Sequence, residues 1–427
     1  MDILILSLNF DPETVGIGRY SGEMAFWLAE RGHRITVITA PPYYPQWQIQ
    51  APYHNWFQRE YRRGVEIRRA PIWVPAQPTA IRRLLHLASF GLSAFVMLAG
   101  QLKRPPERLI VVAPAFFCAL PGLLFARICQ WRGKRVLSVL HIQDFELDAA
   151  FALGLLRNQT TRLLATSVER NILHRFDAVA TISAAMARVL RAKGVEPTAI
   201  RLFPNWVNCS DYTDNKEDSE QADAEALALR GELGIPPDAV VALYSGSMNR
   251  KQGIEILAVA AQHLENDPRI WWLFCGDGPS RCDLEKACMN FHRVLFLPLQ
   301  NEQRFRVLMR LADLHLLPQQ AGAADLVMPS KLLAMLASGR PVVATANAST
   351  GLARILTGAP ASGLITPPGD GKRLGEAIQH LAHNRTERSR MGEAARRQAR
   401  RRWDRERVLR RFERDLLELK PRLSSPQ

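Results

Sequence analysis

The chain of 427 residues is long enough for two or three domains, and its 47% hydrophobic, 23% charged composition is that of a globular protein. Its six cysteines include no Cys-x2-Cys pair, which argues against a zinc site and favours free thiols in a reducing compartment. The net charge of +15 is uneven: residues 1–210 and 371–427 are basic, whereas residues 211–370 are acidic. A basic half suggests an anionic membrane surface or a phosphorylated substrate, and the lack of zinc-finger or RNP-like motifs argues against nucleic acid.

The N-terminal half alternates between apolar runs and polar loops. A buried parallel strand is expected in Asp2 to Phe10, a glycine-containing loop in Pro12 to Tyr20, and a helix in Ser21 to Arg31. A second strand, Arg34 to Thr39, completes a strand–loop–helix–strand unit, which starts a doubly wound α/β domain. Further strands are expected at 109–113, 135–141 and 178–182, and a helix at 184–193.

One apolar segment raises the question of membrane contact. Residues 84–100 carry no charged side chain and follow Arg82 and Arg83, but 17 residues are at the lower limit for a membrane span. We therefore expect a buried helix or a helix lying in the plane of a membrane surface. The apolar run Ile3 to Leu8 is too short for a signal peptide and lacks a basic region, so none is expected.

The character of the chain changes after Asn205. Residues 211–225 are rich in Asp, Glu and Ser, which predicts a linker or an exposed loop. A second α/β series begins at Val240, and residues 386–419 are expected to form an arginine-rich helical tail. Within that series we expect strands at 240–244, 271–275, 294–297, 314–317 and 341–345, and helices at 254–263 and 331–337. The expected organisation is a Rossmann-like domain at 1–210, a linker at 211–234, a second Rossmann-like domain at 235–384 and a basic helical tail at 385–427.

Two doubly wound domains would place the carboxyl ends of their strands at an interdomain cleft, where such sheets bind ligands. After the first strand, Gly16 and Gly18 would let the backbone approach a ligand, although a plain tight turn explains them equally well. In the loop that follows residues 240–244, Arg250 and Lys251 are placed to clamp a diphosphate, with a solvated basic turn as the alternative.

Two further loops carry candidate residues. Ser330 is a good helix-start residue, and Lys331 beside it would seat an anion, or would only cap a surface helix. His141 ends a strand of the first domain, and Asp144 follows it closely. These two side chains suit general base catalysis or the binding of sugar hydroxyls, against the alternative of a structural histidine.

The motifs of several other enzyme classes are absent from the sequence. It has no Asp-x-Asp, which argues against a metal–diphosphate site, and no nucleophile elbow, Walker loop or His-Glu-x-x-His. The charge of a leaving nucleotide would then be met by Arg, Lys and helix N-termini, so neither a metal nor another cofactor is expected.

A set of short motifs occurs in order along nearly the whole chain. They are Gly-Ile-Gly-Arg-Tyr-Ser-Gly-Glu from Gly16, Ala180-Thr-Ile-Ser, Pro204-Asn, Lys251-Gln-Gly, Gly276-Asp-Gly, Pro329-Ser-Lys and Gly339-x-Pro. This set resembles the retaining glycosyltransferases of the GT-B fold, the family 4 type that includes sucrose synthase and the phosphatidylinositol mannosyltransferases. The resemblance implies an α/β fold of two Rossmann-like doubly wound domains facing a cleft, the first on the acceptor side and the second binding the donor nucleotide.

The resemblance also implies a donor site, whose diphosphate-binding basic pair maps to Arg250 and Lys251. Two family glutamates, the second of which holds the ribose, map to Leu326 and Ala334 and are both replaced. The family's sugar-contacting histidine maps to His141, and retention by front-face displacement requires neither an enzymic nucleophile nor a metal. The residues assigned to the donor by motif or resemblance are Gly16, Gly18, Arg250, Lys251, Gly276, Asp277, Asp325 as a substitute for the first glutamate, Ser330 and Lys331.

A more specific resemblance is to the fucosyltransferases of colanic acid exopolysaccharide synthesis. It is carried by Thr39-Ala-Pro-Pro-Tyr-Tyr-Pro-Gln-Trp, Arg83-Leu-Leu-His-Leu and Leu140-His-Ile-Gln-Asp. It implies GDP-fucose as donor. The basic first half and the apolar segment 84–100 suit a polyprenyl diphosphate-linked acceptor and a cytoplasmic enzyme held peripherally on the inner face of a membrane. Two alternatives remain open: a non-catalytic GT-B binding subunit, because the glutamates are missing, and a nicotinamide-dependent Rossmann enzyme, which lacks the full glycine fingerprint.

Overall fold

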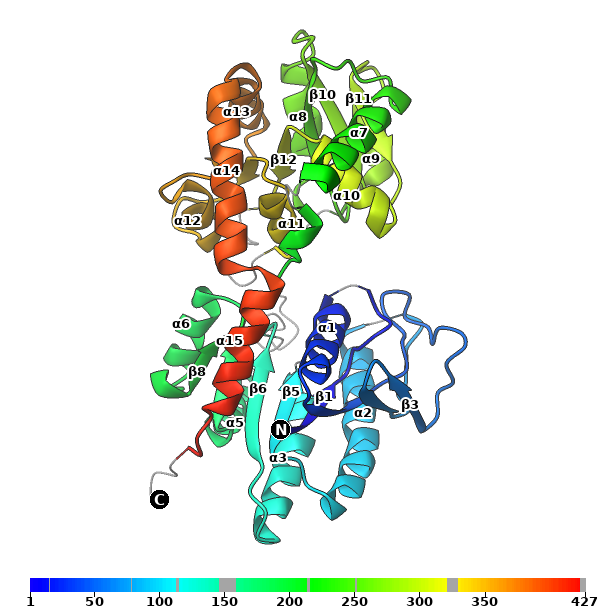
Figure 1. The fold of residues 1–427 in the computed structure, drawn as a ribbon, viewed down its shortest axis with the longest axis vertical. Coiled ribbons are helices and arrows are strands. Elements are labelled where there is room, and N and C mark those ends of the chain that lie inside the picture. Colours follow the sequence, from blue (N-terminus) through cyan, green and yellow to red (C-terminus); the bar gives the residue numbers. More distant parts are fainter. Residues whose placement is uncertain are drawn as a thin grey trace. The chain divides into compact units, whose positions relative to one another are not determined.

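The computed structural model describes residues 1–14, 16–77, 79–112, 115–145, 159–212, 216–249, 252–320 and 329–422 (Figure 1). The chain divides into two compact units. The first unit contains residues 1–205 and 409–427, and the second contains residues 206–408. Each unit is built around its own sheet.

The first unit contains an eight-stranded sheet in which β3 alone runs antiparallel to its neighbour. The central strands are runs of Ile, Leu and Val, and all of β6 is buried, because helices cover both faces of a parallel sheet. In sheet order the strands are β3 (Gln58–Arg62), β4 (Val65–Arg69), β2 (Arg34–Thr39), β1 (Asp2–Ser7), β5 (Arg108–Val112), β6 (Leu137–Ile142), β7 (Ala178–Thr181) and β8 (Ile200–Leu202).

The first helix begins five residues earlier than the sequence predicts. Gly16 has a φ of +59°, which turns the chain into the helix, so half of the expected glycine loop is helical. Gly32, with a φ of +85°, follows the end of this helix as expected. The helices of the first unit are α1 (Gly16–Glu30), α2 (Ala80–Gly100), α3 (Ala115–Trp131), α5 (Gln159–Arg175) and α6 (Ala184–Ala192), with short 3-10 turns at Gln101–Lys103 and Pro197–Ala199.

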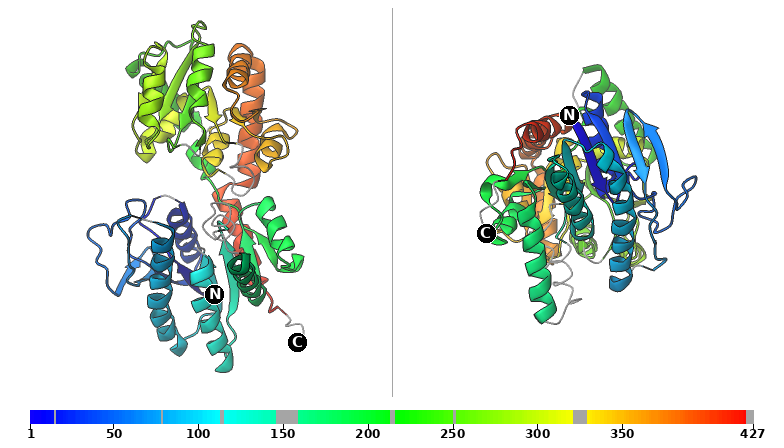
Figure 2. Two further views of the ribbon diagram at one scale, coloured as in Figure 1. Left: turned by 180° about the vertical axis from the view of Figure 1, so that it is seen from behind. Right: turned by 90° about the horizontal axis from the view of Figure 1, so that it is seen from below.

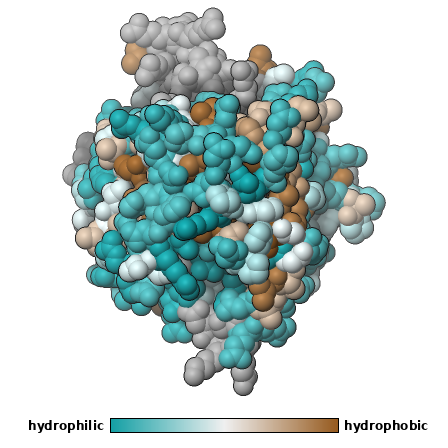
Figure 3. All heavy atoms as spheres, turned by 90° about the horizontal axis from the view of Figure 1, so that it is seen from above, coloured by the Kyte–Doolittle hydropathy of each residue, from teal (hydrophilic) through white to brown (hydrophobic). Residues whose placement is uncertain are grey.

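Helix α2 contains the expected apolar segment and packs beside α3 in both Figure 1 and Figure 2. Residues Ile81–Lys103 are long and apolar enough to cross a membrane by length and composition, and 28% of their most apolar window is buried. The exposed fractions of Ile81 and Leu92 are 72% and 75%. Apolar side chains on part of this helix are therefore exposed to solvent. By comparison, the face of the molecule shown in Figure 3 carries mostly hydrophilic residues.

The second unit contains a six-stranded sheet that is parallel throughout. Strands β11 and β12 have the bounds predicted from the sequence, because short apolar runs there are flanked by polar turns. In sheet order the strands are β11 (Val294–Leu297), β10 (Ile270–Cys275), β9 (Val240–Ser245), β12 (Leu314–Leu317), β13 (Val342–Thr345) and β14 (Gly363–Thr366).

The acidic segment expected as a linker or exposed loop is largely helical, so that prediction was wrong for residues 216–225. Helix α7 buries Leu229 and packs on α10, and Glu232 forms an ion pair of 2.5 Å with Arg304 of that helix. Tertiary contacts thus stabilise a helix of low apolar content. The helices of the second unit are α7 (Lys216–Glu232), α8 (Ile256–His263), α9 (Arg281–Cys288), α10 (Glu302–Leu311), α11 (Lys331–Ala337), α12 (Gly351–Thr357), α13 (Gly371–His383) and α14 (Arg385–Arg402), with a 3-10 turn at Cys209–Tyr212.

The arginine-rich tail forms two helices, α14 and α15 (Arg405–Leu417), which Trp403 and Asp404 separate. Residues from Leu409 onward belong to the first unit. There the buried carboxylate of Glu413 accepts hydrogen bonds from Arg31 at 2.9 Å and contacts His33 at 2.8 Å. The segment expected as one tail is therefore divided between the two units.

Candidate functional site

The order of strands points to one place in each sheet where ligands bind. In the second unit the chain runs outward from β9 through β10 and β11, then returns to β12 on the other side of β9. The first unit has the same reversal between β1 and β5. Open α/β sheets bind ligands beyond the carboxyl ends of the strands at such a reversal.

Beyond the carboxyl ends of β9 and β10, two glycine-containing loops lie against each other. The backbone N–H of Gly246 donates to the carbonyl of Cys275 at 2.9 Å, and that of Met248 donates to Asp277 at 2.8 Å. A Cβ atom at Gly276 would lie 1.9 Å from the carbonyl oxygen of Gly246. Glycine is therefore required there for the two backbones to approach so closely.

Lys331, the first residue of α11, extends to these loops. A Cβ atom at Gly246 would lie 3.4 Å from the Lys331 Nζ, and the ammonium lies 4.6 Å from the centre of the Tyr244 ring. The Nζ atom is buried and has no hydrogen-bond partner among the described residues. Burial lowers the pKa of Lys331 to about 8, because a desolvated ammonium is unfavourable without an anion.

The other predicted residues of the second unit surround this lysine to different degrees. Asp277 lies in the loop after β10, where its carboxylate accepts the backbone N–H of Gly278 at 2.7 Å. Ser330 caps α11 by position, but its hydroxyl makes no capping hydrogen bond. The structure thus brings Gly276 and Lys331 together around Gly246.

Three of the predicted donor residues, Arg250, Lys251 and Asp325, lie outside the described residues. The end of the loop that contains the first two is described: a Cβ atom at Gly253 would lie 3.1 Å from the Gln320 side chain. This loop therefore returns to the segment that follows β12. Ala334, which replaces the family glutamate, lies in α11 one turn after Lys331.

In the first unit, Gly16 and Gly18 form the first turn of α1 rather than a free loop. Gly18 lies against the buried side chain of Glu13, and a Cβ atom there would come within 2.7 Å of the Glu13 Cβ. Glu13 was not singled out by the sequence, because its partners, the backbone N–H groups of Tyr43 and Tyr44, are 30 residues away.

His141 is the penultimate residue of β6 and is fully enclosed. Burial lowers its pKa to about 3, against a smaller opposing effect of its hydrogen bond to the Phe203 backbone, so the ring is neutral and a poor base. Its Nε2 has no hydrogen-bond partner among the described residues. Burial also raises the pKa of Asp144, which the backbone N–H of Phe145 partly opposes.

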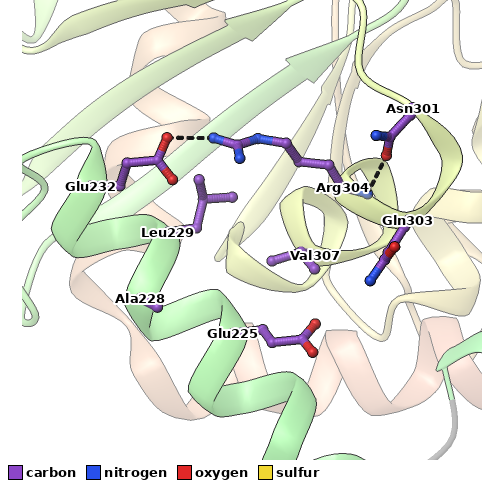
Figure 4. A pocket seen from close by; sticks show the side chains of 8 residues that line it. All are labelled: Glu225, Ala228, Leu229, Glu232, Asn301, Gln303, Arg304 and Val307. Atoms are coloured by element: carbon purple, nitrogen blue, oxygen red, sulfur yellow. Dashed lines mark hydrogen bonds and ion pairs between the residues drawn. The ribbon is translucent and has the colours of Figure 1, made fainter.

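A separate cavity of about 380 Å³ opens between α7 and α10 (Figure 4). It is lined by Glu225, Glu232, Asn301, Gln303 and Arg304 with apolar neighbours, and holds none of the predicted site residues. Within the described ranges, no group of three His, Cys, Asp or Glu side chains is arranged to hold a metal ion.

Comparison with known families assigns both halves of the chain. Residues 15–206 match the glycosyl transferase 4-like domain, and residues 226–398 match the glycosyl transferases group 1. The chain is 40% identical over 373 residues to a protein of Escherichia coli named as the colanic acid biosynthesis glycosyl transferase WcaI, covering 86% of this chain and 89% of that protein.

Solved structures share the fold at low sequence identity. Sucrose-phosphate synthase from Thermosynechococcus elongatus superposes with a TM-score of 0.71 at 18% identity, covering 98% of this chain and 99% of that one. The Anabaena protein HepE, solved in complex with UDP, gives a TM-score of 0.67 at 18% identity, covering 98% and 100%. The fold is thus the GT-B arrangement of two Rossmann-like domains that the sequence predicts.

Proposed function

The chain belongs to the glycosyl transferases that join a 4-like domain to a group 1 domain, and we propose that it moves a sugar from a nucleotide donor to a lipid-linked oligosaccharide in exopolysaccharide synthesis. The proposed reaction retains the anomeric configuration by front-face displacement, in which the leaving diphosphate helps to deprotonate the acceptor hydroxyl. The protein then contributes positioning and anion stabilisation, without a metal.

The ammonium of Lys331, which has no hydrogen-bond partner in the described part of the chain, is the observation that carries this proposal. It is buried beside Gly246 at the strand reversal of the second unit, where a diphosphate would supply the missing anion. Burying a cation without a partner is costly, so the site is suited to a ligand that neutralises it. Arg250 and Lys251 remain the predicted second contact with the diphosphate.

A panel of sugar nucleotides tests the donor class. A ligand that binds only the folded protein raises its unfolding temperature, and at about 100 times Kd it adds roughly 2.7 kcal/mol. We expect stabilisation by one nucleoside diphosphate sugar, reduced in Lys331→Met and in Lys251→Ala but kept in Lys286→Met, an exposed lysine of α9. Equal stabilisation of all four proteins would contradict the assigned diphosphate contacts.

The pathway is proposed from the Escherichia coli relative, whose name assigns it to colanic acid biosynthesis, and the donor sugar from the resemblance to fucosyltransferases. We propose GDP-fucose as the donor. In transfer to a polyprenyl diphosphate-linked acceptor, GDP-fucose should be used at least tenfold better than GDP-mannose or UDP-glucose. Preference for another sugar nucleotide would replace the donor while leaving the reaction class intact.

The acceptor side is proposed to include neutral His141, whose Nε2 has no partner among the described residues and would accept a hydrogen bond from a sugar hydroxyl. Its low pKa favours this role over that of a general base. His141→Ala should raise the KM for the acceptor or the donor sugar without introducing a new acidic limb in the pH profile. An acidic limb lost specifically in this variant would restore the general-base alternative.

Peripheral membrane attachment is proposed through the outer face of α2 and α3. Ile81, Leu85, Leu92 and Val96 recur at helical spacing on α2 and are exposed, and Leu124 of α3 adds to this apolar surface. Between residues 67 and 143 the sequence has eleven Lys and Arg but one acidic residue. Each cation near an anionic leaflet contributes about 1 kcal/mol, so this charge favours an anionic membrane.

Flotation with liposomes checks the attachment. Binding to vesicles with 30% phosphatidylglycerol should weaken as salt rises and should be lost in Leu92→Glu. The matched control is Leu227→Glu, because Leu227 is similarly exposed but lies on α7 of the second unit. Equal loss of flotation in both variants, or salt-insensitive binding, would contradict the proposed face.

A further inference from the structure

Glu13 is a buried carboxylate that joins two loops of the first unit. Its side chain is inside the unit, with an exposed fraction of 4% for the residue. One oxygen accepts the backbone N–H groups of both Tyr43 and Tyr44 at 3.0 Å, and the other accepts the Asn9 side-chain amide at 2.8 Å. Both oxygens are therefore used to fix backbone and side chains that follow β1 and β2.

The helix beside Glu13 is shaped to accommodate this contact. A Cβ atom at residue 18 would lie 2.8 Å from a carboxylate oxygen of Glu13, so only glycine leaves the carboxylate in place. Gly18 and Glu13 thereby couple the first turn of α1 to residues 43 and 44. Burial raises the pKa of Glu13, and its hydrogen bonds to the two tyrosine N–H groups oppose this effect.

The loop that Glu13 fixes is aromatic and has unusual backbone geometry. Trp47 has a φ of +55°, a left-handed conformation that bulky residues adopt only where the surroundings impose it. Its ring contacts the ring of Tyr43, with the centres 5.8 Å apart, and that of His86 on α2, at 5.3 Å. The loop is therefore packed onto the second turn of α2.

The first two turns of α2 add cations and apolar side chains to this aromatic loop. The guanidinium of Arg83 lies 5.5 Å from the centre of the Trp47 ring, and neither Arg82 nor Arg83 forms an ion pair with a carboxylate among the described residues. Leu84 and Leu85 are exposed beside them.

Buried His86 has its Nδ1 committed to the carbonyl of Trp73 at 2.7 Å, whereas its Nε2 has no partner in the described part of the chain. Exposed cations, an aromatic face and exposed apolar side chains together suit an amphiphile with a phosphorylated head. A neutral sugar would gain little from the charge of the two arginines.

We propose that the loop 43–47 and the start of α2 bind the diphosphate head and first isoprene units of a polyprenyl diphosphate acceptor, and that Glu13 is the positioning residue for this surface. This assignment rests on the proposed lipid-linked acceptor. Arg83 contacts the diphosphate, the Trp47 ring lies under the first isoprene unit, and Glu13 holds the loop through Tyr43 and Tyr44 without touching the ligand.

Farnesyl diphosphate is a soluble probe for this surface, with binding measured by titration calorimetry on the full chain. Arg83→Gln should weaken binding tenfold or more, whereas Arg104→Gln, at the opposite end of the same helical segment, should leave it within twofold. Loss of binding in both variants, or in neither, would overturn the assignment of Arg83.

The role of Glu13 is tested by a pair of substitutions. Glu13→Leu leaves two buried N–H groups without an acceptor and should weaken farnesyl diphosphate binding at least tenfold. Glu13→Gln should restore it to within threefold, because the Gln oxygen still accepts both N–H groups and the Asn9 amide can rotate to accept from the new NH2. The matched control is Glu23→Leu, which removes an acid from the middle of α1 that forms an ion pair with Arg19.

Two further measurements separate this proposal from the proposed function. Stabilisation by the sugar nucleotide should be unchanged in folded Glu13→Leu and Arg83→Gln. If the sugar nucleotide does not stabilise the wild type either, the donor site is refuted, whereas the acceptor surface is not affected by that result. In transfer assays both variants should raise the acceptor KM with little change in the donor KM. Equal binding of inorganic pyrophosphate, or of short-chain phosphatidylglycerol, would overturn a polyprenyl diphosphate site.

Discussion

The two units use the same sheet architecture but place opposite buried charges beyond their strands. In the first unit the carboxylate of Glu13 has three hydrogen-bond donors, all supplied by the protein. In the second unit the ammonium of Lys331 has none among the described residues. A buried charge with internal partners maintains a conformation, whereas one without partners marks a place for a ligand. The difference assigns a positioning role to Glu13 and a binding role to Lys331.

The largest effect is expected where two backbones touch. Gly276→Ala would place a Cβ 1.9 Å from a backbone oxygen, whereas Gly18→Ala meets the movable side chain of Glu13 at 2.7 Å. We expect Gly276→Ala to lower the free energy of unfolding by about 3 kcal/mol and Gly18→Ala by about half as much. Urea unfolding measures both, with Gly231→Ala as a control, because a Cβ atom there meets no atom within 4 Å and the residue lies inside α7. A larger cost at Gly18 would reverse this comparison.

Lys331→Met should separate stability from binding. Removing an ammonium that contacts the diphosphate should lower the affinity for the sugar nucleotide roughly 100-fold, which is in the upper part of the range for a hydrogen bond to a charged group. The free protein should become more stable, because the variant no longer buries an uncompensated charge. Glu13→Leu should instead destabilise the free protein. Thermal unfolding with and without the nucleotide gives both quantities, and a destabilised Lys331→Met would show that the ammonium has a structural partner.

The pKa of Lys331, lowered from 10.5 to about 8, predicts two opposite pH dependences. Between pH 8 and 10.5 the unfolded chain binds a proton that the folded one has lost, so this group makes stability rise with pH. The nucleotide needs the charged form, so its affinity should fall about tenfold per pH unit above 8. Calorimetric titrations at pH 7, 8 and 9 measure the effect. Lys331→Met should lose this dependence, and an unchanged slope in the variant would assign it to another group.

A further pH dependence concerns a feature that both units share. His141 and His315 each lie in a buried strand with a pKa lowered to about 3, mainly by burial. Because the unfolded histidines bind protons first, stability is lost as pH falls from about 6.5 toward 3. Each should contribute about 1.4 kcal/mol per pH unit over that range. Urea unfolding of His141→Gln and His315→Gln between pH 6 and 4 should show a smaller slope than the wild type; an identical slope would mean that the histidine titrates normally.

The sequence predicts well those elements that show a clear pattern of apolar residues and turn formers within a short segment. The strand at 34–39 and the helix at 331–337 have the expected bounds because apolar residues and turn formers alternate clearly there. Helix α7 could not be predicted in this way, because it is stabilised by ion pairs between distant residues, such as that of Arg310 with Asp223, 87 residues apart. The start of α1 at Gly16 could not be predicted either, because two nearby glycines are also typical of a loop.

The candidate site follows the same division. Lys331 could be nominated from its place at a helix start, but its burial and missing partner depend on Tyr244 and Gly246, which approach it only in the folded sheet. Glu13 could not be predicted as a site residue, because the sequence around it gives no sign that its carboxylate binds the backbone N–H groups of Tyr43 and Tyr44. Arg250, Lys251 and Asp325 stay predictions.

The return of the last residues to the first unit has a consequence for biosynthesis. A ribosome completes residues 1–205 and the whole second unit before it adds Glu413. The first unit therefore cannot form its contacts of Glu413 with Arg31 and His33 until the second unit has been translated. In truncated products that lack the residues after Val408, the first unit would be incomplete and the second unit intact. A protease should therefore degrade the first unit of such products and leave the second unit uncut.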